Sequence, residues 1–317
     1  MKNKFISKVP LLVVFSFCCS FCFSQTNAVA AKKISVKNVD KTKNMSWKDF
    51  KKVKVAAVQL FWPGKKDEPD PLTSILKYID RAGKEGVQLI VFPEYLLGRF
   101  KVPSPQTKAV AKAAKKNNIY VIVGGWEEFD NGEYSNTAFL FGRDGKIIGK
   151  HYKVHPAVGS KSPYCWPPDK PHDLEWEMKK GDKFNVFELD FGTVGIMTCY
   201  DGYFSESANI LSLKGAEIVC WINGRAGSIE DFIVKADVFR NYIAMIATNL
   251  SPGSGTMIAT WPANILAHVK ETGDHYITAE IDLEALRIQR KHSRVFHQRE
   301  PGKYGVITRK MRPQDKY

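Results

Sequence analysis

The chain has 317 residues, of which 44% are hydrophobic, 25% charged and 12% aromatic. This composition excludes a disordered tail, a collagen-like repeat and a coiled-coil rod, and the length suffices for one large or two small domains with a substantial core. The formal net charge is +14. Because the basic residues are spread along the chain rather than clustered, we interpret them as a solvated surface and expect no nucleic-acid partner.

Residues 1–30 have the pattern of a secretory signal peptide. Three lysines precede an apolar run at residues 9–23 that is too short for a membrane span, and small residues allow cleavage after Ser24 or Ala30. We therefore expect an exported protein, periplasmic or secreted, with residues 31–51 as a polar lead-in. Anchoring through a lipid-modified Cys18, Cys19 or Cys22 is the alternative, although none of them follows the small residue that such a processing site prefers.

The cysteines fit export without forming a disulfide framework. Beyond the signal segment the chain keeps only Cys165, Cys199 and Cys220. An odd count leaves at least one free thiol to explain. Whether Cys165 and Cys220 pair depends on a distance that sequence does not give.

From residue 52 onward, short apolar runs alternate with stretches of helical periodicity. Strands are expected at residues 53–60, 87–92, 119–123, 135–141, 147–153, 184–189, 193–197, 217–222, 245–249, 256–259, 264–269 and 276–281. Helices are expected at residues 70–85, 106–117, 205–214 and 229–241. The irregular stretch 155–182 is long enough to suggest a functional loop. This pattern, which has no internal repeat, predicts one α/β domain with a mixed sheet at residues 52–309, followed by a tail at 310–317.

Three reactive side chains each follow a buried strand. Glu94 comes after the run VQLIVF, Lys153 closes the strand IIGKHYK, and Cys199 follows TVGIMT. Taken alone, a cysteine there is usually a small buried hydrophobe, and a charged residue is usually a solvated strand end. Ligand crevices in α/β sheets form at the carboxyl ends of strands, so the three positions together indicate a site.

Their chemistry is that of covalent catalysis. A nearby ammonium should lower the thiol pKa of Cys199, and a buried carboxylate can take the thiol proton and later deprotonate water. The ammonium of Lys153 and the backbone N–H of Tyr200 can stabilise an oxyanion. We therefore expect Cys199 as nucleophile, Glu94 as base and Lys153 as electrostatic partner.

These motifs resemble those of the nitrilase superfamily of carbon–nitrogen hydrolases. The resemblance rests on the Phe-Pro-Glu motif at residues 92–94, the lysine motif at 149–153 and the cysteine motif at 195–201, and it extends over residues 53–305. It implies an αββα sandwich in a single domain, a Glu-Lys-Cys triad, no cofactor and a homodimer or higher homo-oligomer.

Many members of that superfamily carry a second catalytic glutamate between the lysine and the cysteine. In the N-carbamoyl amino-acid hydrolase branch it lies in a His-Leu-Glu stretch, which resembles the stretch that ends here at Glu175. Glu177 is the rival, because an insertion around residues 163–171 shifts the alignment. Both could instead be exposed loop acids.

The residues after the nucleophile bear on the substrate. The Cys-Tyr-Asp-Gly-Tyr sequence is similar to that of amidases and carbamoylases rather than to the Cys-Trp-Glu of nitrilases, so we expect a small amide or ureido substrate. Gly202 and Tyr203 stand where carbamoylases carry two arginines that grip a carboxylate. Arg225 is the candidate replacement, although a plain surface arginine is the alternative. Tyr203 and Trp166 are further candidates for substrate contact.

Other functions stay open on the same sequence. They are nitrile hydrolysis, amide acyl transfer, a cysteine protease with a Cys-His dyad and an exported binding protein without activity. His151 and His155 are four residues apart, but no nearby residue completes a zinc site, so we expect no metal.

Overall fold

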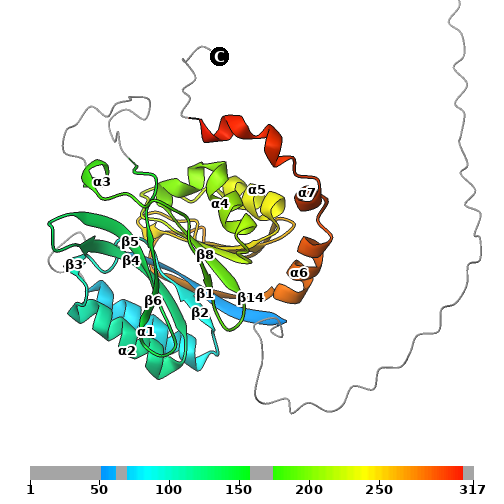
Figure 1. The fold of residues 1–317 in the computed structure, drawn as a ribbon. Helices are drawn as coiled ribbons and strands as arrows, with labels where there is room; N and C mark the ends of the chain where they lie inside the picture. Colours follow the sequence, from blue (N-terminus) through cyan, green and yellow to red (C-terminus); the bar gives the residue numbers. More distant parts are fainter. Residues whose placement is uncertain (1–50, 62–69, 158–173, 310–317) are drawn as a thin grey trace, which may run out of the picture. The chain divides into compact units, whose positions relative to one another are not determined.

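Two β-sheets lie at the centre of the structure, a computed structural model that describes residues 51–61, 70–157 and 174–309 (Figure 1). All of these residues belong to one compact unit, Asn44–Tyr317. The strand order in the first sheet is β11-β1-β2-β4-β5-β6, with β14 paired to β1 and β3 to β4. The order in the second sheet is β13-β12-β10-β9-β8-β7.

The first sheet is mixed. Its strands are β1 (Lys52–Phe61), β2 (Leu89–Val91), β3 (Arg99–Lys101), β4 (Tyr120–Glu128), β5 (Tyr134–Phe141), β6 (Ile147–Tyr152), β11 (Leu250–Ser251) and β14 (His275–Asp282). The second contains β7 (Val186–Glu188), β8 (Thr193–Thr198), β9 (Ile218–Ile222), β10 (Ala244–Thr248), β12 (Met257–Thr260) and β13 (Asn264–His268).

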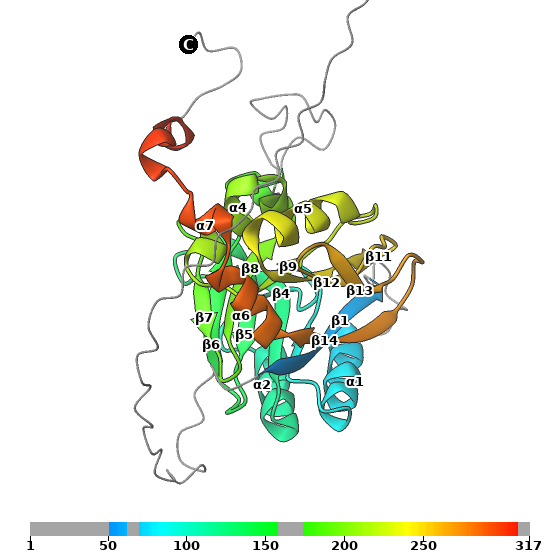
Figure 2. The same ribbon diagram turned by 90° about the vertical axis from the view of Figure 1, so that its right-hand side faces the viewer.

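Helices cover the outer face of each sheet, which gives a four-layer αββα arrangement (Figures 1 and 2). Helices α1 (Pro71–Lys84) and α2 (Pro105–Asn117) pack on the first sheet, and α4 (Ser205–Leu213) and α5 (Asp231–Asn241) on the second. A third apolar core fills the space between the sheets and contains side chains such as Val55, Val91, Ile196 and Ile222. The central strands thus bury apolar side chains on both faces.

Capping residues define the ends of α1 and α2. Asp70 caps α1 by accepting a hydrogen bond from the backbone of Leu72, and proline occupies the first helical position. Ser104 and Thr107 form a capping box at the start of α2, and Asn118 ends that helix in the left-handed conformation. These caps satisfy helix-end groups that burial would otherwise leave unpaired.

The α/β domain and the sandwich implied by the resemblance are confirmed, and the mixed strand pairing expected from periodicity is divided between two sheets. Apolar runs show that strands are buried, but they do not show which strands pair, because the central strands of either sheet carry the same pattern. Helices α6 (Leu283–Lys291) and α7 (Arg294–His297) and strand β3 were not predicted. All three are short, and exposed side chains dominate each of them.

Strand direction explains why the predicted reactive residues can meet. β2 runs parallel to β4, and two antiparallel steps through β5 return β6 to the same direction. In the second sheet β8, β9 and β10 are parallel. The carboxyl ends of β2 and β6 therefore share one edge of the first sheet, and those of β8 and β9 share one edge of the second.

The predicted signal segment, the C-terminal tail and the insertion at residues 163–171 lie outside the described residues, as does Cys165. In the described part, no helix combines the length and the apolar character needed to cross a bilayer. Cys220 is a fully buried free thiol in the core between the sheets.

Candidate active site

Glu94, Lys153 and Glu175 meet at the carboxyl ends of β2 and β6. The Lys153 Nζ atom lies 3.1 Å from Glu94 Oε1 and 2.5 Å from Glu175 Oε1. Lys153 and Glu94 are completely buried, and Glu175 nearly so. One buried cation is therefore shared by two carboxylates.

Further hydrogen bonds orient the two carboxylates. The Asn136 side chain donates to Glu94 Oε1 at 2.6 Å and to Glu175 Oε1 at 3.3 Å. Glu94 Oε2 is buried and has no hydrogen-bond partner among the described residues. A Cβ atom on Gly224 would lie 3.0 Å from that oxygen, so glycine there lets the loop after β9 approach the carboxylate closely. Glu94 thus keeps one oxygen for another group.

Glu175 lies on the short helix α3 (Leu174–Glu177), which points it toward Lys153. Its Oε1 atom accepts a hydrogen bond from the hydroxyl of Tyr95, and its Oε2 atom accepts one from the backbone of Ala157. Glu177, two residues later, is exposed. Of the two rival glutamates, Glu175 is therefore the one that the fold places against Lys153.

Cys199 begins a tight turn directly after β8. It is the first residue of the 3₁₀ helix η2 (Cys199–Tyr203). Its φ of 45° lies in the left-handed region, which residues other than glycine seldom adopt. The indole of Trp221 donates a hydrogen bond of 2.8 Å to the carbonyl oxygen of Cys199. A Cβ atom on Gly202 would lie 2.3 Å from that indole, so glycine makes room for the ring. Tyr200, whose backbone N–H was the predicted oxyanion donor, is the next residue of the turn.

The expectation of a lowered thiol pKa at Cys199 is wrong. Burial and the negative charges of Glu94 and Glu175 raise the pKa of Cys199 to about 12, against the lowering effect of Lys153 and Arg225. Two carboxylates surround one ammonium, so the local charge is already negative and a thiolate would add to it. On this balance the Cys199 side chain rests as a neutral thiol.

The other two groups also depart from ordinary behaviour. Burial raises the pKa of Glu94, and the charge of Glu175 adds to this, while Lys153 and Asn136 act against it. Burial alone would lower the pKa of Lys153, but the negative charges of Glu94 and Glu175, and that of Cys199 whenever it is a thiolate, outweigh burial and raise that pKa. The site thus holds a permanent ammonium beside a carboxylate that accepts a proton more readily than an exposed one.

A second buried cluster surrounds Asp201, two residues after Cys199. His151 lies with Nε2 3.0 Å from Asp201 Oδ2, and His155 lies with Nδ1 2.9 Å from Oδ1. Both histidines therefore contact a carboxylate. In the described part of the chain, no group of three or more His, Cys, Asp or Glu side chains is arranged so that it could hold a metal ion.

Arg225 follows β9 and lies near the thiol, where its charge lowers the Cys199 pKa. Its guanidinium lies 4.8 Å from the ring centres of both Tyr203 and Trp221, and it forms an ion pair with Glu230 through Nη1. The Nε and Nη2 atoms are buried and have no hydrogen-bond partner among the described residues. Trp166, the remaining candidate for substrate contact, lies outside those residues.

Several of these residues escaped sequence analysis. Asn136, Tyr95 and Trp221 hydrogen-bond to the catalytic candidates, and Asp201 bonds to the backbone of Thr198 and Val154 beside them. No motif in the sequence points to these contacts. The one available signal was a polar Ser-Asn-Thr run at residues 135–137, which begins an otherwise apolar strand.

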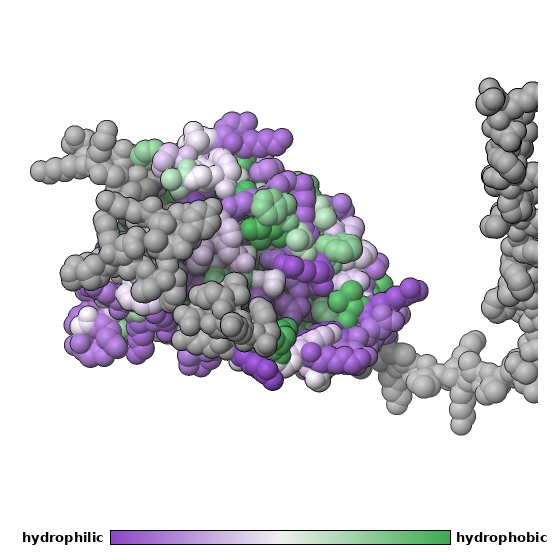
Figure 3. Space-filling view, turned by 90° about the horizontal axis from the view of Figure 1, so that it is seen from above, coloured by the Kyte–Doolittle hydropathy of each residue, from purple (hydrophilic) through white to green (hydrophobic). Residues whose placement is uncertain are grey.

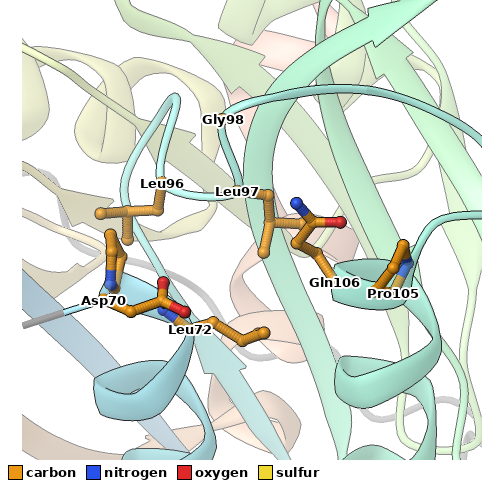
Figure 4. A pocket seen from close by; sticks show the side chains of 8 residues that line it. Asp70, Leu72, Leu96, Leu97, Gly98, Pro105 and Gln106 are labelled. Carbon is orange, nitrogen blue, oxygen red and sulfur yellow. The ribbon is translucent and has the colours of Figure 1, made fainter.

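A cavity of about 400 Å³ lies elsewhere, at the start of α1 and α2 (Figure 4). Its lining includes Asp70, Leu96, Leu97, Pro105 and Gln106. Its one carboxylate caps α1, so the lining offers no second reactive centre.

Comparison with known proteins agrees with the fold. The carbon–nitrogen hydrolase family model matches residues 54–291. An omega-amidase NIT2-B from Xenopus laevis is 28% identical over 269 residues, which covers 76% of this chain and 93% of the relative. The human omega-amidase NIT2 is 25% identical, with 76% and 93% covered.

Solved structures give the same picture. A carbon–nitrogen hydrolase from Helicobacter pylori superposes with a TM-score of 0.68 at 19% identity, covering 82% of this chain and 99% of that one. Nit3 of Saccharomyces cerevisiae, a member of branch 10 of the nitrilase superfamily, superposes with a TM-score of 0.64 at 22% identity, covering 79% of this chain and 97% of that one.

Proposed function

Since the chain belongs to the carbon–nitrogen hydrolase family, we propose that it hydrolyses a small amide or N-carbamoyl compound through a thioester on Cys199. The observation that carries this proposal is the pair of contacts from Lys153 Nζ, 3.1 Å to Glu94 and 2.5 Å to Glu175, beside the strained turn of Cys199. The names of the omega-amidase relatives favour the amide over the nitrile.

In the first half-reaction, the Cys199 sulfur attacks the carbonyl carbon while its proton passes to Glu94. Because the thiol pKa is about 12, proton transfer must accompany attack, and the unpartnered Oε2 of Glu94 is the acceptor. The ammonium of Lys153 and the backbone N–H of Tyr200 stabilise the oxyanion. Glu94 then returns the proton to the amide nitrogen, the C–N bond breaks, and ammonia leaves.

In the second half-reaction, water hydrolyses the thioester. Glu94 takes a proton from water, the hydroxide oxygen bonds to the acyl carbon, and the sulfur leaves and regains its proton. Glu175 holds Lys153 in place through the 2.5 Å contact and keeps it charged. The products are a carboxylic acid and the resting enzyme.

Arg225 and Tyr203 form the proposed substrate wall. Two buried guanidinium N–H groups without a described acceptor favour a substrate with a carboxylate, because a carboxylate can accept from both. The test compares the monoamide of succinic acid with butanamide, a neutral analogue of similar length. Arg225→Met should lose activity on the acid and keep it on butanamide, whereas equal loss on both would remove Arg225 from this role.

The direct test of the function is ammonia release by purified protein from amides, N-carbamoyl compounds and nitriles, with Cys199→Ala as control. Release from amides or N-carbamoyl compounds by the wild type alone is expected. Release only from nitriles would assign the nitrile chemistry, and release from none would leave a binding protein.

Homodimer formation is a further part of this proposal. Phe232 and Phe239 are 67% and 57% exposed and lie seven residues apart, so they share one face of α5. Ile210 and Leu213 on α4 are also exposed, while α1 and α2 expose no large apolar side chain. Apolar patches lie among hydrophilic side chains on the upper surface (Figure 3). A second copy is the partner that buries the same face on both sides. Phe239→Glu should convert a dimer to a monomer in light scattering.

Export is proposed from the lysines and the apolar run of residues 9–23, which precede the matched family region. Expression of the full chain followed by fractionation and N-terminal sequencing tests it. A mature end at residue 25 or 31 outside the cytoplasm is expected. An intact, cytoplasmic chain would contradict export.

A further inference from the structure

The Asp201 carboxylate accepts five hydrogen bonds, although no lysine or arginine pairs with it among the described residues. Oδ2 accepts from the backbone of Thr198 at 3.1 Å and contacts His151 Nε2 at 3.0 Å. Oδ1 accepts from the backbone of Val154 at 3.2 Å and from the backbone and ring of His155, each at 2.9 Å. The side chain is fully buried.

Two of the backbone groups adjoin the catalytic candidates. Thr198 directly precedes Cys199, and the Val154 N–H belongs to the peptide bond that follows Lys153. Val154 and Asp201 are 47 residues apart in sequence and follow strands of different sheets. One carboxylate therefore links the backbone beside the nucleophile to the backbone beside the ammonium.

The same link reaches the second glutamate. The segment that Asp201 holds at Val154 and His155 continues to Ala157, whose N–H donates to Glu175 Oε2. The ring of His155 also stacks on Phe204, with ring centres 3.7 Å apart, at the end of the nucleophile turn. Asp201 is thus the shared anchor of both segments.

The charge of Asp201 suits this task. Burial alone would raise its pKa, but hydrogen bonds from His151 and His155 outweigh burial and hold the pKa well below its usual range. Both oxygens of a carboxylate accept hydrogen bonds, whereas an amide offers one oxygen and turns two N–H donors toward the other contacts. The left-handed backbone of Cys199 also needs surroundings that hold it.

We propose that Asp201 is a positioning residue that joins the Cys199 turn to the segment after Lys153. It thereby holds the thiol and the ammonium in the relative position that attack requires. The catalytic purpose of this positioning rests on the proposed function. The positioning itself is testable without a substrate, because alkylation of Cys199 reports the surroundings of the thiol directly.

The test compares Asp201→Asn with Asp237→Asn, which changes another buried aspartate on α5, paired with Arg240. Alkylation by iodoacetamide and hydrolysis of the best amide are measured on folded protein. Asp201→Asn should slow alkylation about tenfold and lower kcat about 100-fold, with KM within about threefold, as expected when oriented groups move slightly. Asp237→Asn should lower only Tm.

His155→Phe keeps a ring against Phe204 and removes one bond to Asp201, so it serves if Asp201→Asn does not fold. It should lower kcat about tenfold with little change in KM. If both variants lower Tm but leave alkylation and kcat at the wild-type values, Asp201 is merely structural and the proposal is overturned. If the wild type hydrolyses no amide while Asp201→Asn still slows alkylation, the proposed function fails but the positioning role of Asp201 is supported.

Discussion

The Lys153 Nζ atom lies closer to Glu175 than to Glu94, at 2.5 Å against 3.1 Å. Glu175 also accepts from Tyr95 and from the backbone of Ala157, whereas Glu94 keeps Oε2 without a described partner. The two carboxylates therefore differ in what they can do. Glu175 is saturated by donors and holds the ammonium, and Glu94 has an oxygen available for a proton.

Removal of the ammonium should affect chemistry more than binding. Lys153→Met leaves two buried carboxylates without their cation, so we expect kcat to fall about 1,000-fold with a much smaller change in KM. Lys153→Arg keeps the charge but not the compact shape, and it should rescue poorly. Steady-state kinetics on the best amide provides the measurement.

Lys150→Met is the matched control for that change. Lys150 lies on β6, the strand that Lys153 directly follows, and forms a 2.5 Å ion pair with Glu127, but its side chain is 28% exposed. Its loss should leave kcat within about twofold, since partly exposed pairs contribute little. A change in KM alone for Lys153→Met would make Lys153 a substrate anchor and contradict the role proposed for it.

The raised thiol pKa predicts an unusual pH dependence of alkylation. Because the pKa of Cys199 is about 12, the thiolate fraction should rise tenfold per pH unit through the neutral range. Iodoacetamide should therefore react with the native thiol at a rate that keeps rising to at least pH 9. In urea the profile should level near the ordinary pKa of about 8.5. A native plateau near pH 7 would show instead that Lys153 dominates and that the thiol is a thiolate at rest.

The sequence predicts most strands and helices of the sandwich because burial on both faces imposes continuous apolar runs. It does not predict how the strands divide between two sheets. Pairing is decided by contacts between distant segments, such as β1 with β14, which apolar periodicity does not encode.

The candidate site shows the same division. Glu94, Lys153 and Cys199 were predictable because each interrupts an apolar strand at its carboxyl end. Asp201 was not, since a single polar residue in a turn is common, and Asn136 left only the polar run at residues 135–137 as a signal. The sign of the thiol pKa shift also depends on three-dimensional facts, namely burial and the second carboxylate of Glu175.

Gly202 should tolerate no side chain while Trp221 is present. Gly202→Ala brings Cβ to 2.3 Å from the indole, which must move and weaken its bond to the Cys199 carbonyl. We expect a loss of about 1–3 kcal/mol in unfolding free energy and a lower kcat. Gly302→Ala, where no atom lies within 4 Å, is the control and should change neither. Thermal unfolding measures this, and an unchanged Tm for Gly202→Ala would contradict the packing argument.

Glu175 and Glu177 provide the sharpest comparison because they are two residues apart on α3 but face different surroundings. Glu175→Gln should reduce turnover by about 100-fold or more, since the amide holds Lys153 less firmly and adds no charge to keep it protonated. Glu177→Gln should equal the wild type, because Glu177 is exposed. Glu94→Gln should also be nearly inactive, because the base is lost.

Mass spectrometry of each variant soaked with substrate reveals any acyl adduct on Cys199. An adduct that accumulates in Glu175→Gln would place its defect in thioester hydrolysis, and none would place it in attack. Full activity of Glu175→Gln would reduce the site to the three residues Glu94, Lys153 and Cys199.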